Sequence, residues 1–533
     1  MAWGGSGGQV DNIRKTGKST TQRAAEASRA SGPGFIEQID ITSNQNKSKT
    51  DSVVNGTVNL MYYESLLQDH IAAEVTFVDS GGAIDNDTVL SGLPLVGEEN
   101  VQLKFSDNQG NTLVFNNKNN NSFYVGDHTP IGDDSTKSSV NLQLITREAI
   151  KNGKTGVEIR LDGKISEHVE RLLTDKEYLA TEKDLTIEET TNNVNYTGAK
   201  SKPYFLINKM SKDAIPSGES NPNATNNSAG FLFYETAEGF YFKSIDGLMG
   251  KPQKLKVIYN NTPGSGGKDI PAGYDVKALS YSKGSSLNII KKLKYGAWNT
   301  KIVTFNPFNM DYEVSSLSAA EKEQYLELAG KALPVFNDEF NSGEENKNFS
   351  RTTFMVKDTG TLPTGTGLGE DQQQLTKSKE VNYDPNTITN QSIMRYNQMF
   401  SSTVTIVIPG DLSLHAGDSI WVDTVELKQT ANKACEDEVN KKDGGKYVIA
   451  TMCHYLTPRE TYTKLILIRD SVGRTTPTRS RSETRKEDPG KYWNDRRKWR
   501  GGGPRNKYGQ NVKTSDTATT TDWSARRKAR RGR

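Results

Sequence analysis

Short runs that alternate apolar and polar residues dominate the first third of the chain. They begin at Phe35, and each ends at a Gly, Asn, Asp or Ser. The runs are FIEQIDIT, VNGTVNL, AAEVTFVDS, ENVQLKF, TLVFNN, SFYVGD and VNLQLIT. Short strands separated by regular turn signals are typical of a β-sandwich or β-barrel. We therefore predict a first β-barrel domain at residues 35–163.

The pattern changes after Gly163, where the apolar spacing becomes helical. Ile165, Val169, Leu172 and Leu173 predict one amphipathic helix. A second helix is predicted in KPYFLINKMSKDAI, with one face formed by Phe205, Leu206, Lys209 and Met210. The segment AGFLFYETAEGFYFKSIDGLM then predicts two aromatic strands joined as a hairpin across Thr236 to Gly239. This small α/β domain, at 164–262, needs a cover on both faces of its hairpin.

Strand patterns resume beyond residue 254 and continue to residue 471, which predicts a second β-barrel domain at 263–473. Within it, Ser318 followed by Glu321 forms a capping box, so we expect a helix at 318–336. Residues 338–392 are mostly polar and include TGTLPTGTGLGEDQQQ, which predicts a long loop insertion.

Two distant segments resemble each other. LPLVGEENVQLKF begins at residue 93 and LSLHAGDSIWVDT at residue 412. Both contain an apolar pair, a glycine, an acid and then alternating apolar positions, if one gap is allowed to align the glycines. Such an internal repeat predicts two barrels of similar design in one chain.

Charge is distributed unevenly over the 533 residues. Residues 474–533 contain 19 Lys and Arg against 6 Asp and Glu, whereas residues 1–473 contain 49 against 59. Residues 1–34 are rich in Gly, Ser and Thr and form a flexible N-terminal arm in our prediction. The chain is therefore an acidic body followed by a basic extended tail at 474–533. With no bilayer-length apolar run and no signal-peptide pattern, we expect synthesis in a cytoplasm and no membrane insertion.

The candidate chemistry is sparse. Cys435, Cys453 and the five histidines have no zinc-site spacing, and Cys453 and His454 are adjacent on a strand, so they point to opposite faces. NTPGSGGKD lacks the first glycine and the Ser or Thr of a phosphate-binding loop, and GTGLG has no strand before it. Acid pairs such as Glu98–Glu99 and Glu188–Glu189 are common in a chain with 65 acids. We predict no catalytic residue, cofactor or metal.

The basic tail interleaves Lys and Arg with Tyr492, Trp493, Trp499, Tyr508 and Trp523. It could bind nucleic acid, stay solvated, or wrap onto acidic surfaces of neighbouring subunits with tryptophans as anchors. We favour the third interpretation. The candidate contact residues are Trp493, Arg496, Arg497, Trp499, Trp523, Arg526 and Arg527. In the small domain, Phe231, Phe233, Phe240 and Phe242 are either interface anchors or core residues.

Two parts of the sequence resemble baseplate hub proteins of contractile-tailed bacteriophages, above all T-even-like marine phages, and the hub portion of type VI secretion spikes. The first part contains PYFLINKMSKDAIP, AGFLFYETAEGFYFKSIDGLM, VIYNN, GYDVKALSYS and FNPFNMDYEV, and the second contains PGDLSLHAGDSIWVD and HYLTPRETYTKLILIRDS. The resemblance covers about 35–473 and leaves out the arm and the tail.

The resemblance implies a mainly β protein with two tube-like β-barrels and a small α/β domain, assembled as a homotrimer. Six similar barrels in a ring would adapt a sixfold tail tube to a threefold central spike. The implied partners are the tube or distal tube protein, the spike, wedge proteins at the basic tail, and genomic DNA in transit through an acidic channel. The implied location is the baseplate of the virion. Two alternatives stay open, a spike-associated cell-wall hydrolase and a hub whose tail binds nucleic acid.

Overall fold

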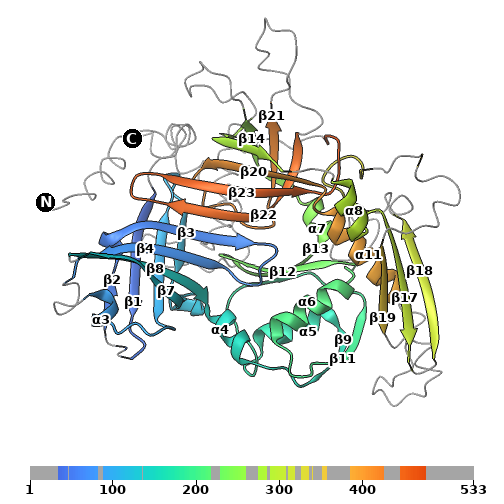
Figure 1. The fold of residues 1–533 in the computed structure, drawn as a ribbon, viewed down its shortest axis with the longest axis horizontal. Coiled ribbons are helices and arrows are strands. Elements are labelled where there is room, and N and C mark those ends of the chain that lie inside the picture. Colours follow the sequence, from blue (N-terminus) through green and yellow to red (C-terminus); the bar gives the residue numbers. More distant parts are fainter. Residues whose placement is uncertain are drawn as a thin grey trace, which may run out of the picture. The chain divides into compact units, whose positions relative to one another are not determined.

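The computed structural model describes residues 34–45, 47, 49–81, 88–134, 136–217, 228–259, 274–284, 288–307, 310–318, 326–334, 339, 351–356, 385–424 and 444–475 (Figure 1). These residues all belong to one compact unit. The predicted N-terminal arm, both glycine-rich motifs and nearly all of the basic tail lie outside the described residues. In the described part, no helix is both long and apolar enough to cross a membrane.

The first third of the chain forms a twisted, mainly antiparallel sheet, the first sheet unit (blue in Figure 1). In the sheet its strands lie in the order β2-β1-β5-β7-β8-β4-β3, and β6 pairs with β5. All seven predicted strand runs are confirmed. The strands are β1 (Phe35–Thr42), β2 (Thr50–Ser52), β3 (Thr57–Ser65), β4 (Ala72–Asp79), β5 (Asn100–Ser106), β6 (Thr112–Phe115), β7 (Phe123–Asp134) and β8 (Lys137–Thr146). Short helical turns η1 (Val54–Gly56), α3 (Val89–Gly92) and η2 (Lys118–Asn120) connect them.

A second sheet unit follows the small domain and includes the last strands of the chain. Its order is β15-β14-β21-β22-β23-β20-β16. The strands are β14 (Gln253–Tyr259), β15 (Val276–Lys277), β16 (Ser280–Lys283), β20 (Ser402–Pro409), β21 (Ser419–Thr424), β22 (Gly445–Leu456) and β23 (Thr461–Arg469). The second unit begins at β14, so it starts within the range predicted for the small domain.

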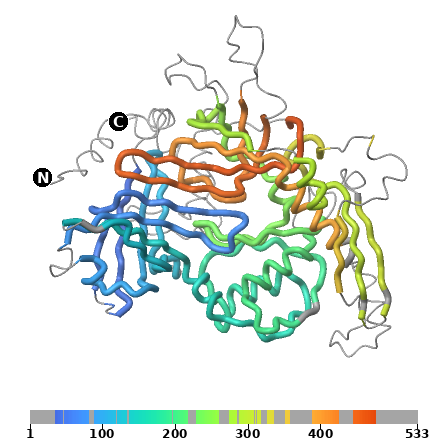
Figure 2. The backbone as a smooth tube through the Cα atoms, in the orientation of Figure 1, coloured from blue at the N-terminus to red at the C-terminus, as the bar shows by residue number. Residues whose placement is uncertain are grey.

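The small domain lies between the two units in the sequence (green in Figure 2). After α4 (Arg147–Lys154) it contains β9 (Arg160–Lys164), α5 (Ile165–Thr174), β10 (Leu185–Ile187), β11 (Asn193–Thr197), α6 (Pro203–Asp213), β12 (Phe231–Thr236), β13 (Gly239–Ser244) and α7 (Ile245–Gly250). The hairpin β12–β13 turns at Thr236–Gly239, as predicted. One hairpin face packs on α5 and α6 and the other on the second sheet unit, so both faces are covered, as expected.

A separate three-stranded sheet, the side sheet, is inserted into the second unit. It has the order β18-β17-β19 and consists of β17 (Asn299–Asn306), β18 (Asp311–Ser318) and β19 (Arg351–Val356). Helix α8 (Ile289–Tyr295) precedes it, and α11 (Pro385–Gln398) covers one of its faces. Thr300 Oγ1 and Asn390 Oδ1 of α11 are 3.0 Å apart, which fixes that cover.

Three local predictions differ from the structure. The helix predicted at 318–336 is wrong for the described residues 326–334, which are not helical, and Ser318 is the last residue of β18, opposite Asn299; residues 319–325 lie outside the described residues. The predicted loop 338–392 includes β19 and the start of α11. The pairing of β19 with β17 and the packing of α11 on the side sheet outweigh the polar composition of this segment. On α6, Phe205 is 60% exposed, since the buried face is formed by Tyr204, Leu206, Ile207 and Met210.

The predicted closed barrels are also not present as such in the described residues. In each unit the two strands at the ends of the strand order follow one another along the chain, but they do not pair with each other among the described residues. These end strands are β2 and β3 in the first unit and β15 and β16 in the second, so neither sheet closes into a barrel there. Moreover, β22 pairs with β3, so both units merge into one 15-stranded sheet.

Candidate assembly site

The two sheet units have the same strand connectivity. Read along the chain, the first unit uses β1, β2, β3, β4, β5, β7 and β8, and the second uses β14, β15, β16, β20, β21, β22 and β23. Strands at the same position in these two series have corresponding neighbours in their sheets. One difference is that β1 is antiparallel to β5, whereas β14 is parallel to β21. The second unit is therefore a structural repeat of the first.

The turns that lead into β5 and β21 match in detail. Val125 donates its N–H to Glu99 and accepts one from Glu98, and Ile449 bonds in the same way with Asp418 and Gly417. Glu98 and Gly417 both have positive φ, 63° and 82°. The carboxylates of Glu99 and Asp418 are buried, and each accepts the N–H of the residue three positions earlier.

These contacts correct the sequence alignment of the two segments. Glu98 corresponds to Gly417, so the segments that start at Leu93 and Leu412 align without the gap that we introduced to superpose their glycines. Leu93 and Leu95 then correspond to Leu412 and Leu414, and all four are buried. The feature that the two turns share is a residue in the left-handed backbone conformation, which Gly adopts freely and Glu adopts at a cost.

The next strands also match. β7 has an irregularity in its register with β8 between Val125 and Asp127, and β22 has one in its register with β23 between Ile449 and Thr451. Beyond these bulges the environments differ. The later part of β22 pairs with β3, whereas the corresponding part of β7 has only β8 as a strand partner among the described residues. β7 carries Pro130 there, a residue typical of edge strands.

The junction between the units is the ladder of Leu60–Ser65 on β3 with Thr451–Leu456 on β22. Tyr62 and His454 are directly opposite each other, and their rings stack with centroids 6.1 Å apart. Leu456 of the second unit packs in the core of the first, as does Leu412. The junction is thus a continuation of sheet and core, which indicates a rigid connection.

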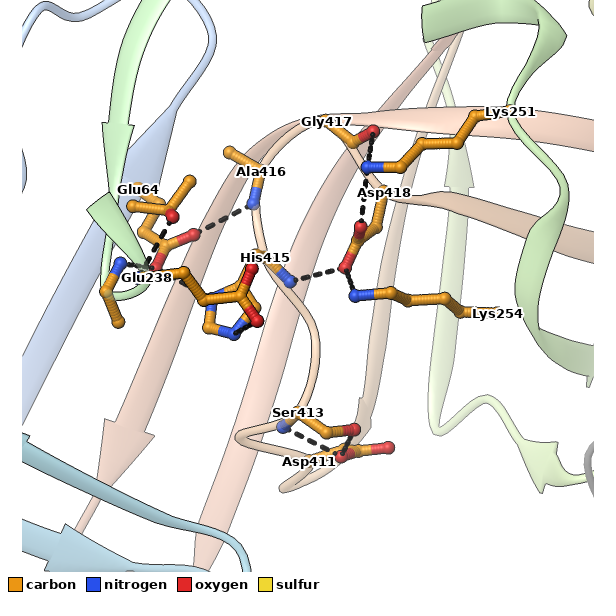
Figure 3. Close-up of polar contacts among 12 residues, drawn as sticks. Glu64, Glu238, Lys251, Lys254, Asp411, Ser413, His415, Ala416, Gly417 and Asp418 are labelled. Atoms are coloured by element: carbon orange, nitrogen blue, oxygen red, sulfur yellow. Dashed lines mark hydrogen bonds and ion pairs between the residues drawn. The ribbon is translucent and has the colours of Figure 1, made fainter. Parts of the chain in front are cut away.

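A buried carboxylate lies where both units meet the small domain. Glu64 of β3 accepts the N–H groups of Ala237 in the hairpin turn and of Ala416 in the second unit, at 2.9 and 2.8 Å (Figure 3). It also accepts the Tyr62 hydroxyl, and His415 Nδ1 lies 3.0 Å away. Burial alone would raise the pKa of Glu64, but His415 and these donors lower it. Burial disfavours charge on His415, and Glu64 outweighs it, so the pKa of His415 is raised. Both shifts favour the charged forms of Glu64 and His415.

Further buried charges connect the small domain to its neighbours. Asp418 pairs with Lys251 and Lys254 after α7 (Figure 3). Arg395 of α11 pairs with Asp246 of α7 and with Asp470, which follows β23, at 2.7 Å each. Removing one partner of a fully buried pair, as those of Arg395 are, typically costs about 3–5 kcal/mol.

One face of the merged sheet is only partly buried and runs across both units over β8, β4, β3, β22, β23 and β20. We call it the shared sheet face. Among the positions named below only Glu74 and Lys464 are charged, and Lys137 at the start of β8 is exposed on the same side. The positions are Ser139, Asn141, Gln143 and Ile145, then Ala72, Glu74, Thr76 and Val78, then Asn59, Met61 and Tyr63, then Thr451, Cys453 and Tyr455, then Tyr462, Lys464 and Ile466, and then Thr403, Thr405 and Val407.

The structure places part of the predicted contact residues. Phe231, Phe233, Phe240 and Phe242 all lie in the core of the small domain against α5 and α6, as the second of our two interpretations expected. An interface role for these strands stays a prediction. The tail residues Trp493, Arg496, Arg497, Trp499, Trp523, Arg526 and Arg527 lie outside the described residues.

The residues considered for chemistry have structural roles here. His454 is buried beside Thr463, while Cys453 lies on the shared sheet face, so the two point to opposite sides as predicted. Glu99 binds backbone N–H groups of its own turn, and Glu188 binds Ser244 at the start of α7. Within the described ranges, no group of three or more metal-binding side chains occurs.

No family model matches the sequence, and no curated protein matches it. Solved structures do match. A tail protein of Neisseria meningitidis MC58 has 7% identity and a TM-score of 0.43, over 82% of this chain and 97% of that one. The 43 kDa tail protein of prophage MuSo2 from Shewanella oneidensis has 7% identity and a TM-score of 0.45, over 81% and 99%.

The E. coli c3393 protein has 10% identity and a TM-score of 0.34, over 83% of this chain and 79% of that one. That protein is a type VI secretion component and is described as structurally similar to the T4 tail proteins gp27 and gp5. The chain is thus structurally similar, over most of its length, to phage tail proteins and to a type VI secretion component. At these identities and scores the likeness assigns no residue roles.

Proposed function

We propose that this chain is a structural hub protein of a contractile tail baseplate, located in the virion. The observation that carries the proposal is the repeated sheet unit, joined edge to edge within one chain by β3 and β22. A subunit with two like units can present six similar surfaces when three copies form a ring. The sequence resemblance to baseplate hubs supports the same assignment.

In this proposal the homotrimer adapts symmetry. Its six sheet units match a sixfold tail tube or distal tube protein on one side. Its three small domains and side sheets differ from the repeated units, so they are available for a threefold spike and for wedge proteins. The buried ion pairs at Glu64, Asp418 and Arg395 hold the small domain in one position, as a protein that connects the tail tube to the spike requires.

The shared sheet face is the surface that we assign to the channel. A nearly uncharged face is poorly suited to solvent, where charged side chains are common. It also offers phosphates little to bind, because its cationic side chains among the described positions of these strands named above are Lys464 and, at the start of β8, Lys137. DNA gains little from counterion release on such a wall and would pass without sticking. We had expected an acidic channel; this face favours a neutral one.

The basic tail remains the candidate for contacts with wedge proteins or neighbouring copies, through its tryptophans and arginines. No observation on the described residues favours the alternatives of a cell-wall hydrolase or a nucleic-acid-binding tail. Both have direct assays, namely release of peptidoglycan fragments and salt-dependent binding of DNA that is lost on deletion of 474–533.

The mass of the purified protein and its position in a tail test the proposal together. The expected result is a particle of three 58.9 kDa chains, or a monomer that becomes a trimer on addition of spike protein. A reconstruction of the tail should place this trimer between tube and spike. A protein that forms another oligomer, or that is absent from the baseplate, would refute the function.

A further inference from the structure

The junction within the chain shows how two of these sheet units join. In it, the part of β22 that follows the bulge pairs with β3. A closed ring of three such chains contains three of these junctions and needs three equivalent ones between chains. In the repeat, β7 holds the position of β22 and β16 holds that of β3. The strands that correspond to the junction and are still available between chains are therefore β7 and β16.

Both strands lie at an edge of the described sheet. Among the described residues, β16 forms a ladder with β20 alone, and the part of β7 beyond its first bulge forms one with β8 alone. Thr129 and Pro130 are exposed on this part of β7, whereas His454 at the matching place on β22 is fully buried. An exposed strand edge readily accepts a strand of another chain.

The matching positions on β7 and β22 follow by counting from the repeated turns. Val125 corresponds to Ile449, and both strands have their bulge immediately afterwards. Further along the strands, Thr129 therefore corresponds to Cys453, and Pro130 corresponds to His454.

The matching positions on β16 and β3 follow from the rows of paired residues that cross each unit. One row contains Val125, Leu144, Ala73 and Tyr62, and its counterpart contains Ile449, Leu467, Val404 and Lys283. Lys283 thus corresponds to Tyr62, and Gly284 corresponds to Tyr63. Gly284 donates its N–H to the carbonyl of Thr403 on β20, at 2.9 Å. Since backbone groups alternate along a strand, Lys283 directs its own N–H and carbonyl away from β20.

We propose that β7 of one copy pairs with β16 of the next copy, in the register that β22 has with β3. We call this contact the seam. Because His454 lies opposite Tyr62, Pro130 would lie opposite Lys283 and Thr129 opposite Gly284. The shared sheet face would continue across the seam into the next copy. This inference rests on the proposed trimer and names its contact.

Pro130 makes the seam weaker than the junction within the chain. Leu66 donates its N–H to the carbonyl of Ala450, and with the register of β3 and β22 this bond shows that His454 directs its N–H to β3. Pro130, at the corresponding position, has no N–H to donate to Lys283 of the next copy. Copies are therefore held by a less complete ladder than the two units of one chain, and the proline limits unspecific strand pairing of free subunits.

A designed disulfide tests the seam directly. Thr129 and Gly284 would form a pair without mutual hydrogen bonds, in which the Cα atoms are close enough for a disulfide. In full-length protein carrying Cys435→Ser and Cys453→Ser, Thr129→Cys with Gly284→Cys should give a covalent three-chain species on a denaturing gel without reductant. Thr129→Cys with Ser280→Cys is the matched control, because Ser280 lies on the same face of β16 but roughly 13 Å further along, so no link should form.

The outcomes separate the seam from the proposed function. Trimers whose introduced cysteines stay unlinked would overturn the seam and leave the function intact. A wild type that forms no trimer, alone or with spike protein, would refute the proposed function and the seam with it.

Restoring the missing donor tests the seam without a cross-link. Pro130→Val places an N–H opposite the carbonyl of Lys283 and should raise the trimer fraction several-fold where the wild type is partly dissociated, since each of the three seams gains a hydrogen bond. Thr129→Val is the control, because the N–H of this residue faces β8, and it should leave the fraction unchanged. Native mass spectrometry at matched concentration measures both. No rise in Pro130→Val, or an equal rise in both variants, would show that the edge of β7 does not meet β16.

Discussion

At the residue scale, His454 shows how the junction limits the choice of side chain. It is fully buried between the two units and stacks on Tyr62. Burial lowers the pKa of His454 to about 4. Charge on His454 is thus disfavoured in the folded junction, whereas the unfolded chain binds a proton near pH 6.5.

We therefore predict that His454 makes the protein acid-sensitive. Stability from the neutral imidazole is complete above about pH 6.5 and falls as the pH drops toward about 4, by about 2 kcal/mol at pH 5. His454→Phe should flatten this part of the pH profile of urea unfolding, even if it lowers stability at pH 7.

Glu64 and His415, which both act on the pKa of His454, titrate in other pH ranges. The raised pKa of His415 means that its contribution is complete below about pH 6.5 and is lost on the alkaline side, while the lowered pKa of Glu64 places its loss below about pH 4.5. An unchanged slope in His454→Phe would show that His454 is not the responsible group.

At the element scale, the turns before β5 and β21 show what the sequence could and could not predict. The alternating strands were identified correctly because each turns one apolar face to a core. Every second residue is then apolar, and this alternation is visible in the sequence. The equivalence of Glu98 and Gly417 was not readable, because it depends on backbone conformation, and the two residue types share no chemistry. Aligning glycine with glycine therefore introduced a false gap.

Gly417 is more restricted than Glu98, and this leads to a second prediction. Both residues have positive φ, but a Cβ at Gly417 would also collide with the Tyr234 hydroxyl of the small domain. Gly417→Ala should cost about 2–3 kcal/mol, combining backbone strain with the clash. Glu98→Gly should be neutral or slightly stabilising, because it removes the strain at the corresponding position.

A double-mutant cycle separates the two costs. Tyr234→Phe removes the hydroxyl, and its combination with Gly417→Ala should recover the part due to the clash while the backbone strain remains. Denaturant unfolding of the four proteins measures the coupling. Strictly additive losses would mean that Tyr234 does not restrict Gly417.

Helices and insertions were harder to predict for a different reason. The capping pattern at Ser318 predicted a helix to residue 336, yet the described residues 326–334 are not helical, and Ser318 itself is the last residue of β18, which has eight cross-strand pairs with β17. Similarly, Arg395 is a charged residue in a polar stretch, and nothing in the sequence indicates that it will be buried between Asp246 and Asp470. Long-range pairing decides both positions, and periodicity reports only local preference.

At the scale of the whole molecule, the repeat was foreseen but the way its halves join was not. Two closed tubes were expected, and instead β22 continues into β3, so that one sheet serves both units. The register of that ladder depends on side chains more than 380 residues apart, such as Ser65 and Thr451, which hydrogen bond at 3.0 Å. Its consequence is a face without a boundary between the units, so the sparsely charged surface that we assign to the channel extends over both of them.

The assignment of the shared sheet face leads to the last prediction. Thr76→Arg in the first unit with Thr405→Arg in the second would place six new cations in the ring of a trimer. Virions carrying them should assemble tails of normal appearance but eject DNA several-fold more slowly, since each arginine can bind passing phosphates, and added salt should relieve the delay.

Thr76→Gln with Thr405→Gln is the matched control, with longer side chains but no charge, and it should eject at the normal rate. Ejection kinetics triggered on purified receptor measure both variants. Normal ejection by the arginine variant would place this face away from the DNA path. Loss of tail assembly in both variants would show instead that another protein packs against it, because a buried contact rejects extra volume whether or not it carries charge.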